Sequence, residues 1–161
     1  MSDAETLDGM STVEVRTSAT AALIPTIRAV ASDLAARADF DLDAISDLRM
    51  AVDEACATLA SVARGDEPLT VVFEATRESL RIDAWVPTED GVDVPRDGFG
   101  WAVLQTLVDT VEAGPSDQAT VIAGNGSTTP VAGISLVKRL RRYSTSDASA
   151  ERPDADVSVA W

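Results

Sequence analysis

Hydrophobic residues recur at helical spacing in three stretches of the chain and alternate with polar residues in five others. The helical spacing predicts helices over residues 21–38, 42–64 and 101–111. The alternation predicts strands over residues 12–17, 69–75, 80–85, 119–123 and 131–137. The elements therefore follow one another as strand, two helices, two strands, helix and two strands.

Two strand pairs are joined by short links, residues 76–79 and 124–130, which favours antiparallel hairpins over parallel crossovers. We therefore expect an α+β fold, a two-layer α/β sandwich with the helices on one face of a mixed, mostly antiparallel sheet. Residues 87–100 lack apolar periodicity and are rich in Pro and Gly, so they form a loop. A loop of this length inside a compact domain is usually functional.

The helix over residues 42–64 has two distinct faces. Asp41 or Asp43 can cap its start, and Gly65 follows its last turn. An apolar stripe faces the core and contains Ile45, Leu48, Val52, Cys56 and Leu59. A second face combines acidic and hydroxyl side chains, namely Asp47, Glu54, Thr58 and Ser61. On spacing alone, this second face is more typical of solvated surface than of a binding site.

Composition and charge narrow the function. The chain has 161 residues and a formal net charge of −14, which disfavours direct binding to nucleic-acid phosphates and favours a basic protein partner. It has no His and one Cys, so a His base, a phosphorylated His, a disulfide and a cysteine metal cluster are excluded. Cys56 lies on the apolar stripe and is expected to be an inert, buried thiol.

Neither end of the chain shows a structural pattern. Residues 1–11 are polar and acidic without a secretion-signal pattern, and no apolar run is long enough to span a bilayer, so we expect a cytoplasmic protein without a membrane partner. We expect a disordered segment over 1–11, one domain over 12–140 and a flexible tail over 141–161. The basic cluster Lys138, Arg139, Arg141 and Arg142 is expected to be a solubilising end of the last strand.

Three motifs, in this order of elements, resemble the GHKL (Bergerat-fold) ATPase domain, and within it the RsbW-type anti-sigma factors of the UsfX-like branch. Residues 47–56, DLRMAVDEAC, look like the N-box helix. Residues 97–109, DGFGWAVLQTLVD, look like the second glycine box. Residues 133–136, GISL, resemble the last strand. The similarity spans residues 12–140.

The resemblance implies a partner-switching regulator of stress or sporulation transcription. Such a protein sequesters an alternative sigma factor, is released by an anti-anti-sigma factor of the STAS type, acts as a homodimer, and phosphorylates that antagonist with ATP and Mg²⁺. Glu54 matches the catalytic Glu, which polarises the attacking hydroxyl. Gly98 and Gly100 match the glycines that approach the phosphates.

Two positions depart from the family pattern. The family's Mg²⁺-binding Asn is replaced by Thr58, whose hydroxyl is a poorer ligand for a hard cation. The first glycine box, Asp-x-Gly, aligns with Val86 and Thr88. Asp90 and Gly91 could bind the cofactor in their place only after a register shift, and Asp83 lies on the other face of its strand.

Two functions follow from this pattern. One is an anti-sigma factor whose kinase activity is weak or lost, because ligand positions are altered while the fold motifs are kept. The other is an active serine kinase, with Glu54 as base and Thr58 at Mg²⁺. The missing His disfavours a sensor histidine kinase, and a third possibility is that the same scaffold binds an unrelated partner.

Overall fold

A computed structural model describes residues 11–114 and 129–141 of the chain. Its strands are β1 (Ser11–Ser18), β2 (Pro68–Ala75), β3 (Ser79–Pro87), β4 (Thr110–Gly114) and β5 (Val131–Arg139). Its helices are a 3₁₀ turn, η1 (Ala21–Leu23), followed by α1 (Ile24–Arg37), α2 (Leu42–Val62) and α3 (Phe99–Leu107). The expected strand over residues 119–123 and its hairpin link lie outside the described residues.

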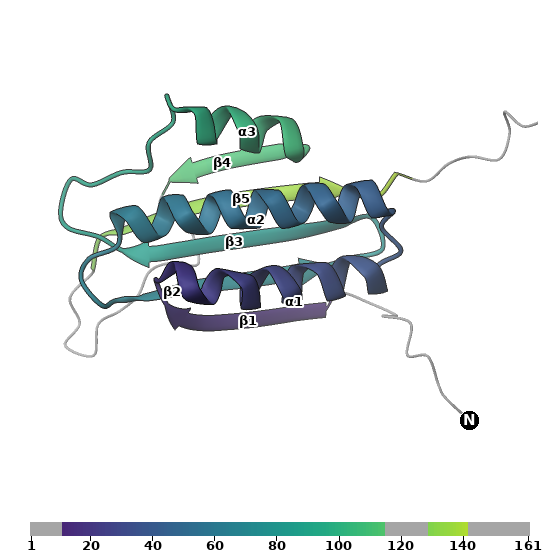
Figure 1. The fold of residues 1–161 in the computed structure, drawn as a ribbon, viewed down its shortest axis with the longest axis horizontal. Coiled ribbons are helices and arrows are strands. Elements are labelled where there is room, and N and C mark those ends of the chain that lie inside the picture. The colour runs from purple at the N-terminus through teal and green to yellow at the C-terminus, as the bar shows by residue number, and fades with distance from the viewer. Residues whose placement is uncertain (1–10, 115–128, 142–161) are drawn as a thin grey trace, which may run out of the picture.

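The five strands form one sheet in the order β1-β2-β3-β5-β4, and all four pairings between neighbours are antiparallel. The three helices cover one face of this sheet, with α2 between α1 and α3 (Figure 1). The expected α+β class and one-sided helix layer are confirmed, and so is the β2–β3 hairpin. No parallel pair occurs among the described strands, so the "mixed" part of the expectation finds no support there.

The core lies between the helices and the inner face of the sheet. From α2 it receives Leu48, Val52, Cys56 and Leu59, which are at most 1% exposed, as the apolar stripe predicted. The inner face of the sheet contributes alternate residues, including Val71, Phe73, Leu80, Ile82, Ala84, Ile134 and Leu136. Burial of these side chains fixes the rotation of α2 and therefore the direction of its second face.

The helix boundaries follow the expected cap signals. The Asp41 side chain accepts a hydrogen bond of 2.8 Å from the backbone N–H of Ala44, so Asp41 rather than Asp43 caps α2. After α2 the chain turns through Gly65, whose φ of +52° lies in the left-handed region that glycine adopts easily. Pro25 occupies the first turn of α1, where its missing N–H costs no hydrogen bond.

The prediction of a helix over residues 101–111 is wrong for its last four residues. Helix α3 stops at Leu107, and Thr110 begins strand β4 on the sheet edge beyond β5. Asp109 fixes this crossing, because its N–H donates to the Val137 carbonyl and its carboxylate accepts from the Arg139 N–H. The β-branched residues around the crossing favour strand over helix. Val111 packs against the core from a strand instead of a helix.

Lys138 is also placed differently from the expectation. Position 138 continues the inward-facing row of β5, and the residue is only 8% exposed. Its Nζ donates to Asp47 Oδ2 on α2 at 2.9 Å and to the Leu107 carbonyl at the end of α3 at 2.6 Å. Lys138 therefore links the sheet to both helices, whereas Arg139 and Arg141 remain exposed.

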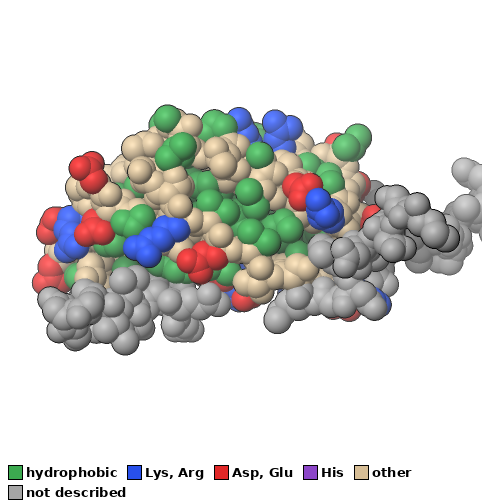
Figure 2. Space-filling view, turned by 90° about the horizontal axis from the view of Figure 1, so that it is seen from below, with side chains coloured by type: hydrophobic (Ala, Val, Ile, Leu, Met, Phe, Trp, Pro, Cys, Tyr) green, Lys and Arg blue, Asp and Glu red, His purple; other side chains and the backbone are tan. Residues whose placement is uncertain are grey.

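The edge strand β1 and helix α1 form one side of the molecule. Seen from that side, hydrophobic side chains gather in the middle of the surface (Figure 2). Val13 and Val15 of β1 and Val30 of α1 are only partly buried against the core. Among the described helices, none is long and apolar enough to cross a membrane.

Candidate functional site

The candidate site lies where the second half of α2 meets the start of α3 and the loop 88–98 that joins β3 to α3. Figure 1 shows this junction at one end of the helix layer, with α3 antiparallel to α2. The antiparallel arrangement brings Glu54 beside Gly100 at this end. At the other end, Lys138 contacts both Asp47 and the Leu107 carbonyl. The two sequence motifs are thereby brought together.

Glu54 occupies the space that a side chain at position 100 would fill. A Cβ on residue 100 would overlap with Glu54 Oε1 and would stand 2.9 Å from Glu54 Cδ. Only glycine at position 100 therefore allows this carboxylate to lie against the first turn of α3. Nothing comparable surrounds Gly98, where an added Cβ would meet no atom within 4 Å.

The start of α3 has free hydrogen-bonding capacity. Its N-cap is Gly98, no side chain caps it, and no acidic residue occurs in its own first turn. The N–H groups at such a start attract an anion. The Glu54 carboxylate comes from α2 and supplies negative charge at the place where a phosphate would otherwise be favoured. Glu54 and an added phosphate would compete for this helix start.

Thr58 lies one turn after Glu54 on the same side of α2 and is half-buried. Its carbonyl accepts the hydroxyl of Ser61 at 2.7 Å, an interaction within the helix. Within residues 11–114 and 129–141, its own hydroxyl has no hydrogen-bond partner and no three His, Cys, Asp or Glu side chains gather as a metal site. Among the described residues, Glu54 is the carboxylate one helical turn from Thr58 that could share a cation with it.

The end of β3 is apolar where the family motif has Asp. Val86 is fully buried and belongs to the hydrophobic core. Thr88 is also fully buried; its N–H donates to the Pro130 carbonyl at 2.9 Å. Its Oγ1 finds no hydrogen-bond partner among the residues that the structure describes. An unpaired buried hydroxyl costs about 1–3 kcal/mol, so Thr88 offers a hydrogen bond to a group that enters the site.

Asp90 and Gly91 form a surface turn that begins directly after Thr88. The Val92 N–H donates to the Glu89 carbonyl at 3.2 Å, and Gly91 has a φ of +79°, as the third position of a type II turn requires. Both residues are exposed. Asp90 shares with Thr88 the lining of an open cavity of about 490 Å³, whose other lining residues are Arg64, Glu89, Thr129 and Pro130.

The loop contributes one residue that the sequence reasoning did not single out. Val94 is 3% exposed and belongs to the main hydrophobic core, whereas the other residues of 89–98 are exposed. A single buried valine holds the loop against the helix layer. The signal in the sequence was a hydrophobic residue between two charged positions, Asp93 and Arg96, in a polar segment.

Asp83 and Cys56 carry titratable side chains but do not take part in the candidate site. Asp83 lies on the outer face of the sheet, where Arg81 donates to both its carboxylate oxygens. This hydrogen bonding raises the pKa of Arg81. In α2, burial first and the charge of Asp53 second raise the pKa of the Cys56 thiol to about 12. Cys56 is thus the inert core thiol that was expected.

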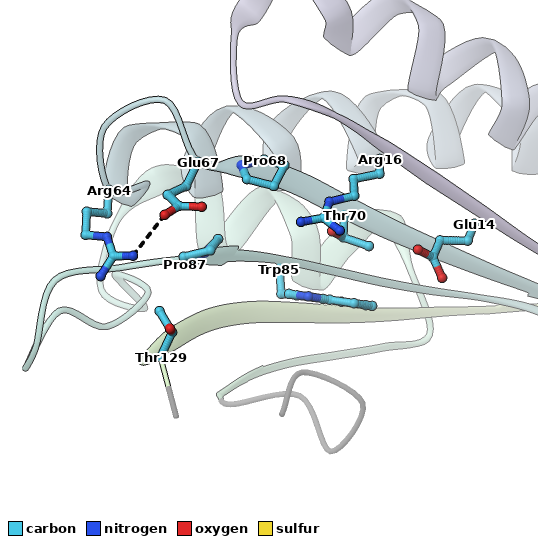
Figure 3. A pocket seen from close by; sticks show the side chains of 9 residues that line it. All are labelled: Glu14, Arg16, Arg64, Glu67, Pro68, Thr70, Trp85, Pro87 and Thr129. Carbon is cyan, nitrogen blue, oxygen red and sulfur yellow. Dashed lines mark hydrogen bonds and ion pairs between the residues drawn. The ribbon is translucent and has the colours of Figure 1, made fainter. Parts of the chain in front are cut away.

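A second cavity of about 380 Å³ opens on the outer face of the sheet, away from the helices (Figure 3). Trp85 lies along its floor, Arg16 reaches over Thr70 from β1, and an ion pair between Arg64 and Glu67 closes one end at 2.9 Å. Arg64 lines both cavities, since it follows α2 at the edge of the sheet. None of the motif residues of α2 and α3 lines this second cavity.

Comparison with known proteins identifies the family of this chain. Residues 17–123 match the family described as Histidine kinase-like ATPase domain, so the chain belongs to that family. Within it, the chain resembles the anti-sigma-F factor RsbW of Mycobacterium tuberculosis. It is 29% identical to that protein over 131 residues, which cover 81% of this chain and 75% of the relative. The same values hold for the relatives from strains CDC 1551 / Oshkosh and H37Rv.

Proposed function

We propose that this protein is an anti-sigma factor that sequesters an alternative sigma factor. The observation that carries the proposal is the similarity to anti-sigma-F factor RsbW over four fifths of the chain. The acidity of the chain, with a formal net charge of −14, suits a sigma factor with basic DNA-binding domains. The proposal also includes release of the sigma factor by an anti-anti-sigma factor of the STAS type. It further places the protein, as a homodimer, in a cytoplasmic stress response.

The proposal includes weak or absent phosphate transfer. Three features of the site support this part. Val86 fills the place of the adenine-reading Asp with a buried methyl-bearing side chain. Glu54 lies against the helix start that would receive a phosphate, and Thr58 offers a hydroxyl where an amide would hold Mg²⁺.

An active kinase is the second candidate function, and the retained Glu54 beside Gly100 favours it. In that case Glu54 would draw the proton from the hydroxyl of the antagonist, and the start of α3 would hold the phosphates after the carboxylate has moved aside. Mg²⁺ would supply charge neutralisation on the transferred phosphate, with Thr58 as its protein contact. The Thr88 hydroxyl, which has no partner among the described residues, would be available to hydrogen-bond the adenine of ATP.

Sigma-factor capture tests the main proposal. The purified chain is mixed with each member of a panel of purified alternative sigma factors, and complexes are separated by size-exclusion chromatography. We expect one member to co-elute with the chain and to lose activity in run-off transcription with RNA polymerase. A panel that gives neither a complex nor inhibition contradicts sequestration. The elution volume of the chain alone reports whether it forms a homodimer.

Calorimetric titration with ATP and Mg²⁺ separates the two candidate functions. We expect no heat of binding at micromolar concentrations. A micromolar Kd would contradict the nucleotide-independent reading, and phosphate transfer to the antagonist would establish the kinase. If transfer is seen, Glu54→Ala should abolish it while sigma-factor capture persists, because Glu54 would then act on the hydroxyl alone.

A further inference from the structure

Large exposed hydrophobic side chains concentrate on the outer surface of α2, α3 and the loop between β3 and α3. Phe99, the first residue of α3, is 86% exposed, and Met50 of α2 is 54% exposed. Val92 of the loop is 40% exposed. Hydrophobic side chains that are exposed singly are common on folded proteins, whereas those that gather on one surface mark interaction sites.

The register between the helices brings Met50 and Phe99 to one surface. Phe99 directly precedes Gly100, which lies against Glu54, and Met50 precedes Glu54 by one helical turn on the same side of α2. Val103 follows Phe99 by one turn along α3 and is half-buried. We call Met50, Phe99 and Val103 the α2–α3 patch. Its three residues lie on two neighbouring antiparallel helices.

The loop beside this patch is strongly acidic. Residues 88–98 contain Glu89, Asp90, Asp93 and Asp97 against a single cation, Arg96, which gives a formal net charge of −3. All five charged side chains are exposed, and Arg96 is already paired with Asp93 at 3.3 Å. On the other side of α2, Arg28 neutralises Asp53 at 2.6 Å, and Arg49 points toward α1 by helical geometry. An apolar patch therefore adjoins a loop with a net negative charge, although Arg64 lies near Glu89 and Asp90 at the far side of that loop.

We propose that the α2–α3 patch is the docking surface for a basic amphipathic helix of the sigma factor, an inference that rests on the proposed function. The apolar face of such a helix lies over Met50 and Phe99, and its basic flank faces the loop 88–98. Methionine adapts its shape to a partner, and phenylalanine supplies the buried anchor that interface hot spots require. The acidic loop accelerates encounter and rejects acidic competitors.

Binding measurements with single variants test the surface. The probe is the sigma factor that the wild-type chain captures from the panel. We expect Phe99→Asp to raise its Kd about 30-fold and Met50→Asp about 10-fold, as for the loss of central apolar anchors. Leu42→Asp is the matched control, because Leu42 is 84% exposed on α2 but lies two turns before Met50. Its Kd should stay within about twofold of wild type.

The charge part of the inference has its own variant. Asp90→Asn combined with Asp97→Asn should lower the association rate at low salt, and this difference should vanish at high salt. Circular dichroism and thermal unfolding of every variant should match the wild type, since all the altered side chains are exposed.

These measurements distinguish failure of the docking surface from failure of the anti-sigma function. Wild-type affinity in both Phe99→Asp and Met50→Asp overturns the docking surface and leaves the anti-sigma function intact. Loss of the antagonist alone, with the sigma factor still bound, also overturns it, because the patch would then serve the other partner. Failure of the wild-type chain to bind any sigma factor in the panel removes the anti-sigma function and this inference together.

Discussion

Lys138 provides a quantitative test of how the site is positioned. Its ammonium group is almost fully buried and contacts Asp47 on α2 and the carbonyl of Leu107 at the end of α3. Lys138→Met keeps most of the aliphatic stem and removes both hydrogen bonds. We expect this variant to be less stable than the wild type, and α3 to lose its anchor to the sheet.

The size of the effect follows from the two contacts. A charged hydrogen bond to a carbonyl contributes about 1.5–3 kcal/mol. The ion pair with Asp47 adds about 0–1 kcal/mol, because the Asp47 side chain is 39% exposed and can be hydrated again. Removal of the buried charge returns part of its desolvation cost. We therefore expect a net loss of roughly 2 kcal/mol, or about 4–8 °C in Tm for a chain of this length.

Urea unfolding followed by circular dichroism measures the loss. Arg139→Met is the matched control, because residue 139 is the exposed neighbour on the same strand and should change stability by less than about 0.5 kcal/mol. A double-mutant cycle with Asp47→Asn isolates the ion pair from the carbonyl contact. A Lys138→Met chain as stable as the wild type, or more stable, would refute the reasoning that the buried ammonium ties α3 to the sheet.

Two further predictions concern the α2 helix. Gly100→Ala should change the free energy of unfolding by less than about 1 kcal/mol, because the added Cβ displaces only the flexible end of the Glu54 side chain and alanine favours the helix. The same substitution should be more favourable in a Glu54→Ala background, where no carboxylate has to move, and urea unfolding that shows the same effect in both backgrounds would contradict the contact. Cys56 should not react with a thiol reagent in the native chain even at pH 9, because a pKa of about 12 leaves the thiol protonated there. The same reagent should label it quickly in denaturant, and rapid native labelling, followed by absorbance, would contradict a buried thiol.

The periodicity of hydrophobic residues alone was sufficient to predict much of the fold. The apolar stripe of α2 and the alternation in β2 and β3 are local patterns that one dominant burial direction produces, and the structure confirms them. The end of α3 was wrong because Val111 fits both a helical stripe and a strand. The decision depended on the pairing of β4 with β5, a contact between residues distant in sequence.

The position of Lys138 and the contacts of the second face of α2 also depend on residues that are distant in sequence. Lys138 was assigned to a solvated cluster because its neighbours in sequence are basic, although the inward row of β5 includes position 138. Spacing alone favoured a solvated second face of α2, and only the family motif assigned Glu54 to a site; in the structure Asp47 pairs with that lysine and Glu54 lies against Gly100. A helix-wheel argument places side chains on a face but cannot show what the rest of the chain puts opposite it.

Val86 departs from the family's first glycine box, and its burial has a direct consequence for the fold. A carboxylate at position 86 would be buried at the end of β3 and would need a ligand to satisfy it. Val86 instead continues the inner face of the strand, and its full burial contributes roughly 1.5–3 kcal/mol. Val94 likewise closes the loop on the core, and Glu54 supplies charge to the start of α3 from within the chain. Val86 and Val94 thus pack in the core without a ligand, whereas Glu54 is retained from the family pattern and meets Gly100 within the chain.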